Sequence, residues 1–174
     1  MRKYVRSQKG FTLIETMIVL AIALIVLLSS TSLGDIVFGN SSATEETKNV
    51  QELFLATKSL KTTSGYGAAT TDLVPQLIAT KQIPKTMTVN AGLLYNEWNG
   101  NETVVSNGST FTYTAPSLPQ DVCIKVATKI SKTGTYATTA INGNAAITGE
   151  VTTAVATTQC NSPAANTVVW VSAS

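Results

Sequence analysis

The sequence contains no histidine, and only 13% of its residues are charged. Histidine supplies the general base in most Ser/His and Cys/His catalytic arrangements and is the commonest protein ligand of zinc. Without it, most of these catalytic sites and the usual zinc sites are excluded. The composition therefore argues against an enzyme, and we expect no catalytic residue, no cofactor and no metal ion.

The few acidic residues of the second half of the chain are widely spaced. Their spacing provides neither a carboxylate pair for general acid–base catalysis nor a calcium-binding loop. No glycine-rich phosphate loop follows a predicted strand. We interpret four of these acidic side chains as solvated charges: Glu97, Glu102, Asp121 and Glu150.

Basic residues are scarce beyond the first ten positions. Residues 1–10 hold four of the twelve Lys and Arg residues and no acidic residue. Residues 11–174 carry eight basic and ten acidic side chains, which gives a net charge of −2. We expect no nucleic-acid partner, because binding to phosphates needs clustered basic side chains.

A long apolar segment follows this basic start. Residues 16–34 contain no charged side chain. As a helix, Phe11–Leu28 would be roughly 27 Å long, close to the hydrocarbon thickness of a bilayer. We predict a membrane-spanning helix whose basic flank stays on the cytoplasmic side. A secretory signal peptide is the alternative, since it also has a basic start and an apolar core.

Glu15 lies inside this apolar segment. An unpaired carboxylate at membrane depth costs about 2–3 kcal/mol, which argues against an ordinary signal peptide. Cleavage between Gly10 and Phe11 would create a cationic amine on Phe11, four residues before Glu15. In a medium of low dielectric constant the amine and the carboxylate would neutralise each other.

The segment KGFTLIE with an apolar helix behind it resembles the class III signal of type IV pilins and pseudopilins. The resemblance implies that a prepilin peptidase cuts after Gly10 and N-methylates Phe11, and that Glu15 helps to align subunits during assembly. An ordinary membrane-anchored surface protein is the alternative.

The apolar residues in 44–61 recur at helical spacing, which predicts the second half of a long N-terminal helix. The charged residues of this segment, Glu46 among them, lie outside its apolar face. That face should pack against a folded body. It consists of Val50, Leu53, Phe54, Thr57 and Leu60.

After Lys61 the composition shifts to Thr, Gly, Ala and Asn. We predict a short helix over Asp72–Thr80, with Pro75 in its first turn, and a small antiparallel sheet behind it. The alternation of Val122–Ile130 favours a strand without excluding a helix. We expect Trp98 and Trp170 to be core or sheet-packing residues. The predicted strands are Thr103–Val105, Thr110–Tyr113, Asp121–Lys129, Thr135–Ala140 and Thr167–Ser172.

The order of motifs in this body is similar to that of type IVb pilins of the bundle-forming and conjugative thin-pilus kind. The motifs that carry the similarity are Ile83-Pro84, Asn96-Glu97-Trp98-Asn99-Gly100, Phe111-Thr112-Tyr113, Leu118-Pro119 and Cys123. Two features depart from that subclass: the leader has only ten residues, and the first mature residue is Phe. The resemblance implies an α+β pilin fold, with a long N-terminal helix packed on a small antiparallel sheet.

Cys123 and Cys160 are the only cysteines. Because the body should be exported, a disulfide between them is expected, and it would contribute about 3–4 kcal/mol in the chain-entropy model. Two unrelated buried thiols are the alternative. In pilins the corresponding bridge bounds the surface-exposed D-region, so the resemblance implies a disulfide-bounded C-terminal region here.

The chain is thus predicted to be a structural subunit of a type IV pilus that polymerises through its N-terminal helix for adhesion, aggregation or conjugation. Its expected partners are copies of itself, the prepilin peptidase, the pilus assembly machinery and, before assembly, the bacterial inner membrane. The final location is the extracellular filament. The predicted parts are a leader (1–10), a hydrophobic assembly helix (11–34), an amphipathic helix (35–61) and a globular head (62–174).

Two related functions remain as alternatives. A type II secretion pseudopilin shares the N-terminal signal but usually lacks a C-terminal disulfide. A minor pilin or tip adhesin would bind a target rather than form the bulk of the filament.

Overall fold

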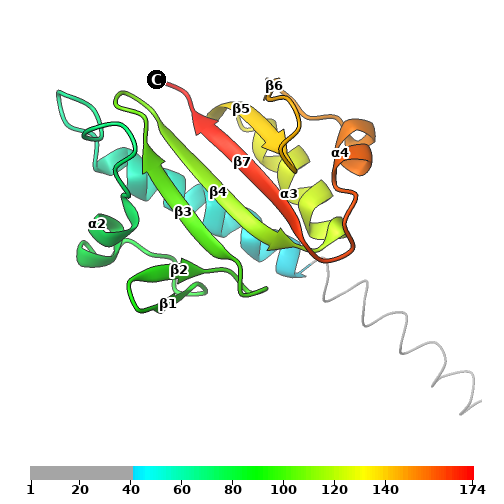
Figure 1. Cartoon of the computed structure of the whole chain (residues 1–174), viewed down its shortest axis with the longest axis horizontal. Coiled ribbons are helices and arrows are strands. Elements are labelled where there is room, and N and C mark those ends of the chain that lie inside the picture. The colour runs from blue at the N-terminus through cyan, green and yellow to red at the C-terminus, as the bar shows by residue number, and fades with distance from the viewer. Residues whose placement is uncertain (1–40) are drawn as a thin grey trace, which may run out of the picture. The chain divides into compact units, whose positions relative to one another are not determined.

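The computed structural model describes residues 41–174. The predicted leader and hydrophobic assembly helix lie outside these residues, as does the part of the amphipathic helix before residue 41. The described chain has an α+β fold in which helices pack against an antiparallel sheet of seven strands (Figure 1). This arrangement confirms the predicted fold class.

Residues 41–59 are helical, which confirms the helix predicted over 44–61 to within two residues of its end. The predicted apolar face is the buried one: Val50 and Thr57 are fully buried, and Leu53 is 1% exposed. The ring of Phe54 on the same face lies 5.5 Å from Phe111 and 4.9 Å from Tyr136, measured between ring centroids. The 41–59 helix is therefore fastened to the sheet mainly by apolar and aromatic contacts.

The sheet has the strand order β1-β2-β3-β4-β7-β5-β6, and every neighbouring pair is antiparallel. The last strand in sequence, β7, lies between β4 and β5 (Figure 1). Alternate residues of β4 and β7 are buried over most of their length, as expected for strands with one face on a core. The strands are β1 Thr88–Asn90, β2 Leu93–Tyr95, β3 Asn101–Ser106, β4 Phe111–Leu118, β5 Tyr136–Ile141, β6 Ile147–Thr148 and β7 Asn166–Ser172.

Four of the predicted strands correspond to β3, β4, β5 and β7. Trp170 in β7 is fully buried, and Trp98 is partly buried against the core, so both tryptophans pack as expected. The sequence reasoning missed β1, β2 and β6, which have two or three residues each. Such short strands show too little alternation to be recognised.

The short helix expected near Pro75 is α2, Val74–Ala79, with the proline in its first turn. Asp72 accepts a hydrogen bond from the backbone N–H of Val74 at 3.0 Å. This bond satisfies one of the free N–H groups at the start of the helix. None of the helices in residues 41–174 has both the length and the hydrophobicity of a membrane span.

The strand predicted over Asp121–Lys129 is wrong, because Gln120–Ser131 forms the helix α3. The alternation of Val122, Ile124 and Val126 suggests a strand. In the structure, however, Ile124 is only partly buried, and the buried residues recur with helical spacing. They are Val122, Cys123, Val126, Ala127, Ile130 and Ser131.

The sequence reasoning also missed the helix α4, Thr153–Gln159. The hydroxyl of Thr152 caps this helix by accepting a hydrogen bond from the N–H of Val155 at 3.3 Å. Threonine and alanine dominate α4, and only Ala156 within it is buried. It therefore lacks the apolar stripe by which a short helix can be recognised.

Candidate functional site: the disulfide-bounded region and a buried acidic cluster

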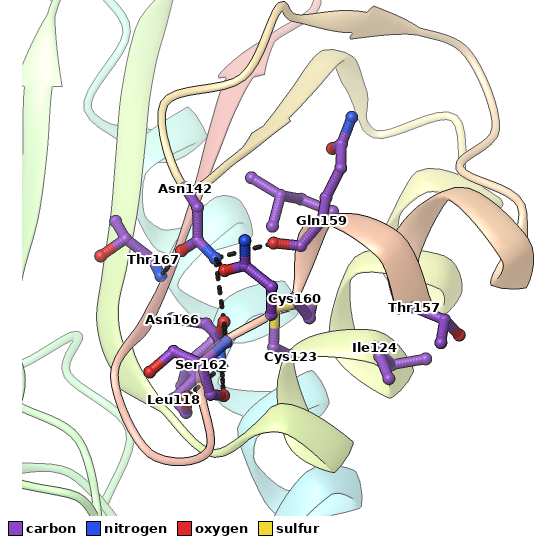
Figure 2. Close-up of a disulfide and its surroundings, with 12 residues drawn as sticks. Leu118, Cys123, Ile124, Asn142, Thr157, Gln159, Cys160, Ser162, Asn166 and Thr167 are labelled. Atoms are coloured by element: carbon purple, nitrogen blue, oxygen red, sulfur yellow. Dashed lines mark hydrogen bonds between the residues drawn. A yellow bond between two sulfur atoms is a disulfide. The ribbon is translucent and has the colours of Figure 1, made fainter.

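Cys123 and Cys160 form a disulfide, as predicted, with their Cα atoms 6.0 Å apart. Cys123 lies in the first half of α3, and Cys160 directly follows α4. Both residues are fully buried. The bond therefore fastens the end of α4 to α3 and closes a region that also contains β5 and β6 (Figure 2).

Two asparagines hold the chain on either side of this bond, as Figure 2 shows. Asn142 donates hydrogen bonds to the carbonyl of Gln159 at 2.8 Å and to Oδ1 of Asn166 at 2.9 Å, and it accepts one from the N–H of Thr167 at 2.8 Å. It thereby ties the turn after β5 to the end of α4 and to the start of β7.

Asn166 is itself fully buried. Its amide donates to the carbonyl of Leu118 at 3.0 Å and to that of Ser162 at 2.6 Å, and its oxygen accepts from the N–H of Ser162 at 3.0 Å. Sequence reasoning missed both asparagines. The Asn142-Gly143 pair is a turn signal from which a turn at Asn142 could have been predicted, whereas nothing local marks Asn166.

The outer side of the disulfide-bounded region is exposed. The exposed residues include 143–146, 148–150, 152–155 and 157–158. Within residues 41–174, Val155 is one of four large apolar side chains that are open to solvent. A frame of covalent and hydrogen bonds thus displays a surface of small and polar side chains that is accessible to other molecules.

A second group of functional interest is a pair of buried acids. Glu46 on the 41–59 helix is 2% exposed and Glu102 in β3 is 1% exposed. The sequence reasoning placed Glu46 outside the apolar face and Glu102 in solvent, and both expectations are wrong. Glu97, Asp121 and Glu150 are exposed, as expected for solvated charges.

Buried neutral groups surround the two acids. The hydroxyl of Tyr113 donates to Oε2 of Glu102, and burial raises the pKa of that hydroxyl well above its usual value, so it remains a donor. The amide of Asn96 lies beside Glu102 and that of Asn49 lies beside Glu46, and each lowers the pKa of its carboxyl. Burial also raises the pKa of both carboxyls.

A cleft of about 230 Å³ opens beside Glu46. A second cleft, of about 390 Å³, lies against the β1–β2 hairpin. Thr86 and Glu97 line both clefts. Within residues 41–174, no group of three acidic, histidine or cysteine side chains converges as a metal site would require. The residues that line the smaller cleft are Glu45, Glu46, Asn49, Thr86 and Glu97.

Three of the predicted site residues, Gly10, Phe11 and Glu15, lie outside the described residues, so their roles stay predictions. The structure brings together the other two, Cys123 and Cys160.

Comparison with known proteins gives matches along nearly the whole chain. The family model described as PilS N terminal matches residues 40–173, and the prokaryotic N-terminal methylation motif matches residues 5–31. No curated protein sequence matches the chain.

Two solved structures from Salmonella typhi are similar to the chain. The crystal structure of a type IVb pilin is 28% identical, covers 73% of this chain and 97% of its own, and has a TM-score of 0.64. The NMR structure of the type IVb pilin PilS is 26% identical, covers 74% of this chain and 94% of its own, and has a TM-score of 0.52.

Proposed function

The chain belongs to the PilS family of type IV pilins, and from this membership we propose how it is processed and assembled. It is a pilin subunit of a type IV pilus. Pilins are structural subunits that polymerise with copies of themselves. The methylation motif over residues 5–31 implies processing by a prepilin peptidase.

The proposed cut lies between Gly10 and Phe11, and the methyl group is added to the new amine of Phe11. The observation that carries this proposal is the match to the methylation motif, whose range includes both residues. Hydrolysis here removes four basic side chains and leaves an amine at the start of the apolar segment. The N-terminal segment of the product then carries one cationic amine, on Phe11, and one carboxylate, on Glu15.

Glu15 is the only charged side chain between Phe11 and Gly34. In the proposed assembly step its carboxylate meets the Phe11 amine of a neighbouring subunit. In a medium of low dielectric constant such a pair is favourable only when both charges are present and close together. The pair would therefore set the register of one subunit against the next.

We place the precursor in the bacterial inner membrane, held by Phe11–Leu28, and the assembled chain in an extracellular filament. The pilus assembly machinery is the proposed partner for this transfer. Burial of apolar segments against each other provides the driving force once they leave lipid. The disulfide-bounded region of the head supports this location, because disulfides persist in oxidising compartments outside the cytoplasm. The filament then serves adhesion, aggregation or conjugation.

A direct test compares wild type with Gly10→Val in a host that contains a prepilin peptidase. Mass spectrometry should find surface pili whose N-terminal peptide starts at a methylated Phe11, and Gly10→Val should leave an uncut, unassembled precursor. Ser7→Val is the matched control, since it changes the leader without touching the cleavage bond. Surface filaments that retain residues 1–10 would refute the proposal.

A further inference from the structure

The carboxyl groups of Glu46 and Glu102 meet inside the head. Glu46 comes from the 41–59 helix, Glu102 comes from β3, and each is at least 98% buried. The two carboxyl groups lie close enough that each affects the pKa of the other. Yet Oε1 of each finds no N–H or O–H donor among the described residues.

A proton shared between the two carboxyls accounts for both observations. An ionised carboxylate accepts hydrogen bonds and cannot donate one, whereas a protonated carboxyl has one O–H to give. Two carboxylates facing each other would repel, and each would leave a buried oxygen without a donor. One proton removes the repulsion and provides a donor between the two groups.

Within residues 41–174, the charged groups that most affect the pKa values of the pair are acids. The titratable groups that act on it are Glu45 on the helix, Glu97 after β2, Tyr113 in β4 and Tyr136 in β5. All of them are acids, and Glu45 and Glu97 raise the pKa of Glu46 further. The amides of Asn49 and Asn96 and the hydroxyl of Tyr113 favour the ionised form, but they do not outweigh burial.

We propose that Glu46 and Glu102 hold a single proton between them, and that this proton couples the attachment of the 41–59 helix on the sheet to pH. The cleft beside Glu46 provides the route by which the proton exchanges with solvent. Of the helices and strands in residues 41–174, the 41–59 helix is nearest in sequence to Phe11–Leu28, the apolar segment through which we propose that subunits assemble. Loss of the proton therefore loosens the part of the head that connects to that segment.

The direction of the effect follows from proton linkage. In the unfolded chain a glutamate ionises near pH 4.3, whereas the pair retains its proton to higher pH. The stability that the shared proton contributes is fully present below the pKa of glutamate in the unfolded chain. It is lost as the pH rises toward the higher pKa of the pair in the folded protein. Across that interval, one retained proton lowers the folding equilibrium constant about tenfold per pH unit.

The test measures thermal unfolding of the full-length chain in detergent micelles by circular dichroism, from about pH 5 to pH 9. Wild type should lose about 3 °C in Tm per pH unit over the lower part of this range. Glu102→Gln should flatten the slope, because its amide donates permanently to Glu46. Glu97→Gln, which removes a charge from the rim of the same cleft, is the matched control and should keep most of the wild-type slope.

An infrared measurement on wild type locates the proton and does not depend on any variant folding. The C=O stretching band of a protonated carboxyl should persist above the pH at which ordinary glutamates ionise and disappear as the pH rises further. Equal slopes for wild type and Glu102→Gln, or loss of that band together with those of ordinary glutamates, would overturn the proposal. A rise in Tm on adding calcium at neutral pH that Glu102→Gln abolishes would also overturn it, by assigning the pair to a cation.

Discussion

The phenol ring of Tyr113 stacks on the indole of Trp170, with ring centroids 5.6 Å apart and ring planes 15° apart. The two residues are partners in the register of β4 and β7. The hydroxyl of Tyr113 also donates to Glu102 in β3, on its other neighbouring strand. One side chain therefore connects three adjacent strands at the centre of the sheet.

Tyr113→Phe keeps the stacked ring and removes the hydrogen bond to Glu102. We expect a loss of about 1–3 kcal/mol in the free energy of unfolding, because a buried carboxyl loses a donor. The hydroxyl lowers the pKa of Glu102, so its removal should also extend proton retention to higher pH. Thermal unfolding at several pH values measures both effects, with Tyr95→Phe as a control at a partly exposed tyrosine. An unchanged Tm would contradict the buried hydrogen bond.

Replacing both Cys123 and Cys160 by alanine should lower the free energy of unfolding by about 3–4 kcal/mol. The bond closes a segment with a sequence separation of 37 residues that has few large side chains. Unfolding of wild type with and without a reducing agent provides the comparison, and the double variant should not respond to the reductant. Two reactive thiols in the folded, exported protein would show that the bond is absent.

Asn166→Asp should destabilise the head by about 2–3 kcal/mol although it barely changes the shape of the side chain. An aspartate cannot donate to the carbonyls of Leu118 and Ser162, and it places a negative charge against them. Asn161→Asp is the matched control, since Asn161 only accepts a hydrogen bond from Asn142 and an aspartate still accepts it. Equal unfolding temperatures for the two variants would exclude the proposed role of Asn166.

Glu15→Val, expressed without wild type, should yield processed subunits but few or no filaments. The substitution leaves the cleavage bond intact and removes the carboxylate that would meet the amine of a neighbour. Yield of sheared filaments measures assembly, and mass spectrometry of the N-terminal peptide shows that processing continues. Met17→Val is a control within the same apolar segment. A normal filament yield from Glu15→Val would eliminate the register role.

The face that the 41–59 helix turns to the core could be read from the sequence. Val50, Leu53, Phe54 and Thr57 recur with the helical period, and the side chains of such a stripe share one environment whatever packs against it. The period of α3 was harder to read. Val122, Ile124 and Val126 alternate as in a strand. The residues that are buried in the structure, which include Cys123 and Ala127, follow the helical period instead.

Burial of Glu46 and Glu102 could not be read from local pattern. Glu46 lies between Glu45 and Thr47, and Glu102 lies between Asn101 and Thr103. Acids among such polar neighbours are usually exposed. Burial becomes possible because the 41–59 helix packs against β3 and β4, which are distant from it in sequence. This packing brings the two carboxyls and the hydroxyl of Tyr113 together. The Asn142–Asn166 contact depends in the same way on the turn after β5 reaching the start of β7.

By itself, the sequence determined the properties that depend on order along the chain. The basic start, the apolar segment with Glu15 and the motif around Gly10 identify the pilin signal, and two cysteines allow only one pairing within a chain. Tertiary structure alone decided that β7 lies between β4 and β5 and that two acids share a buried site. Both depend on contacts between distant segments, whose free energy is gained only when the whole sheet and the 41–59 helix have come together.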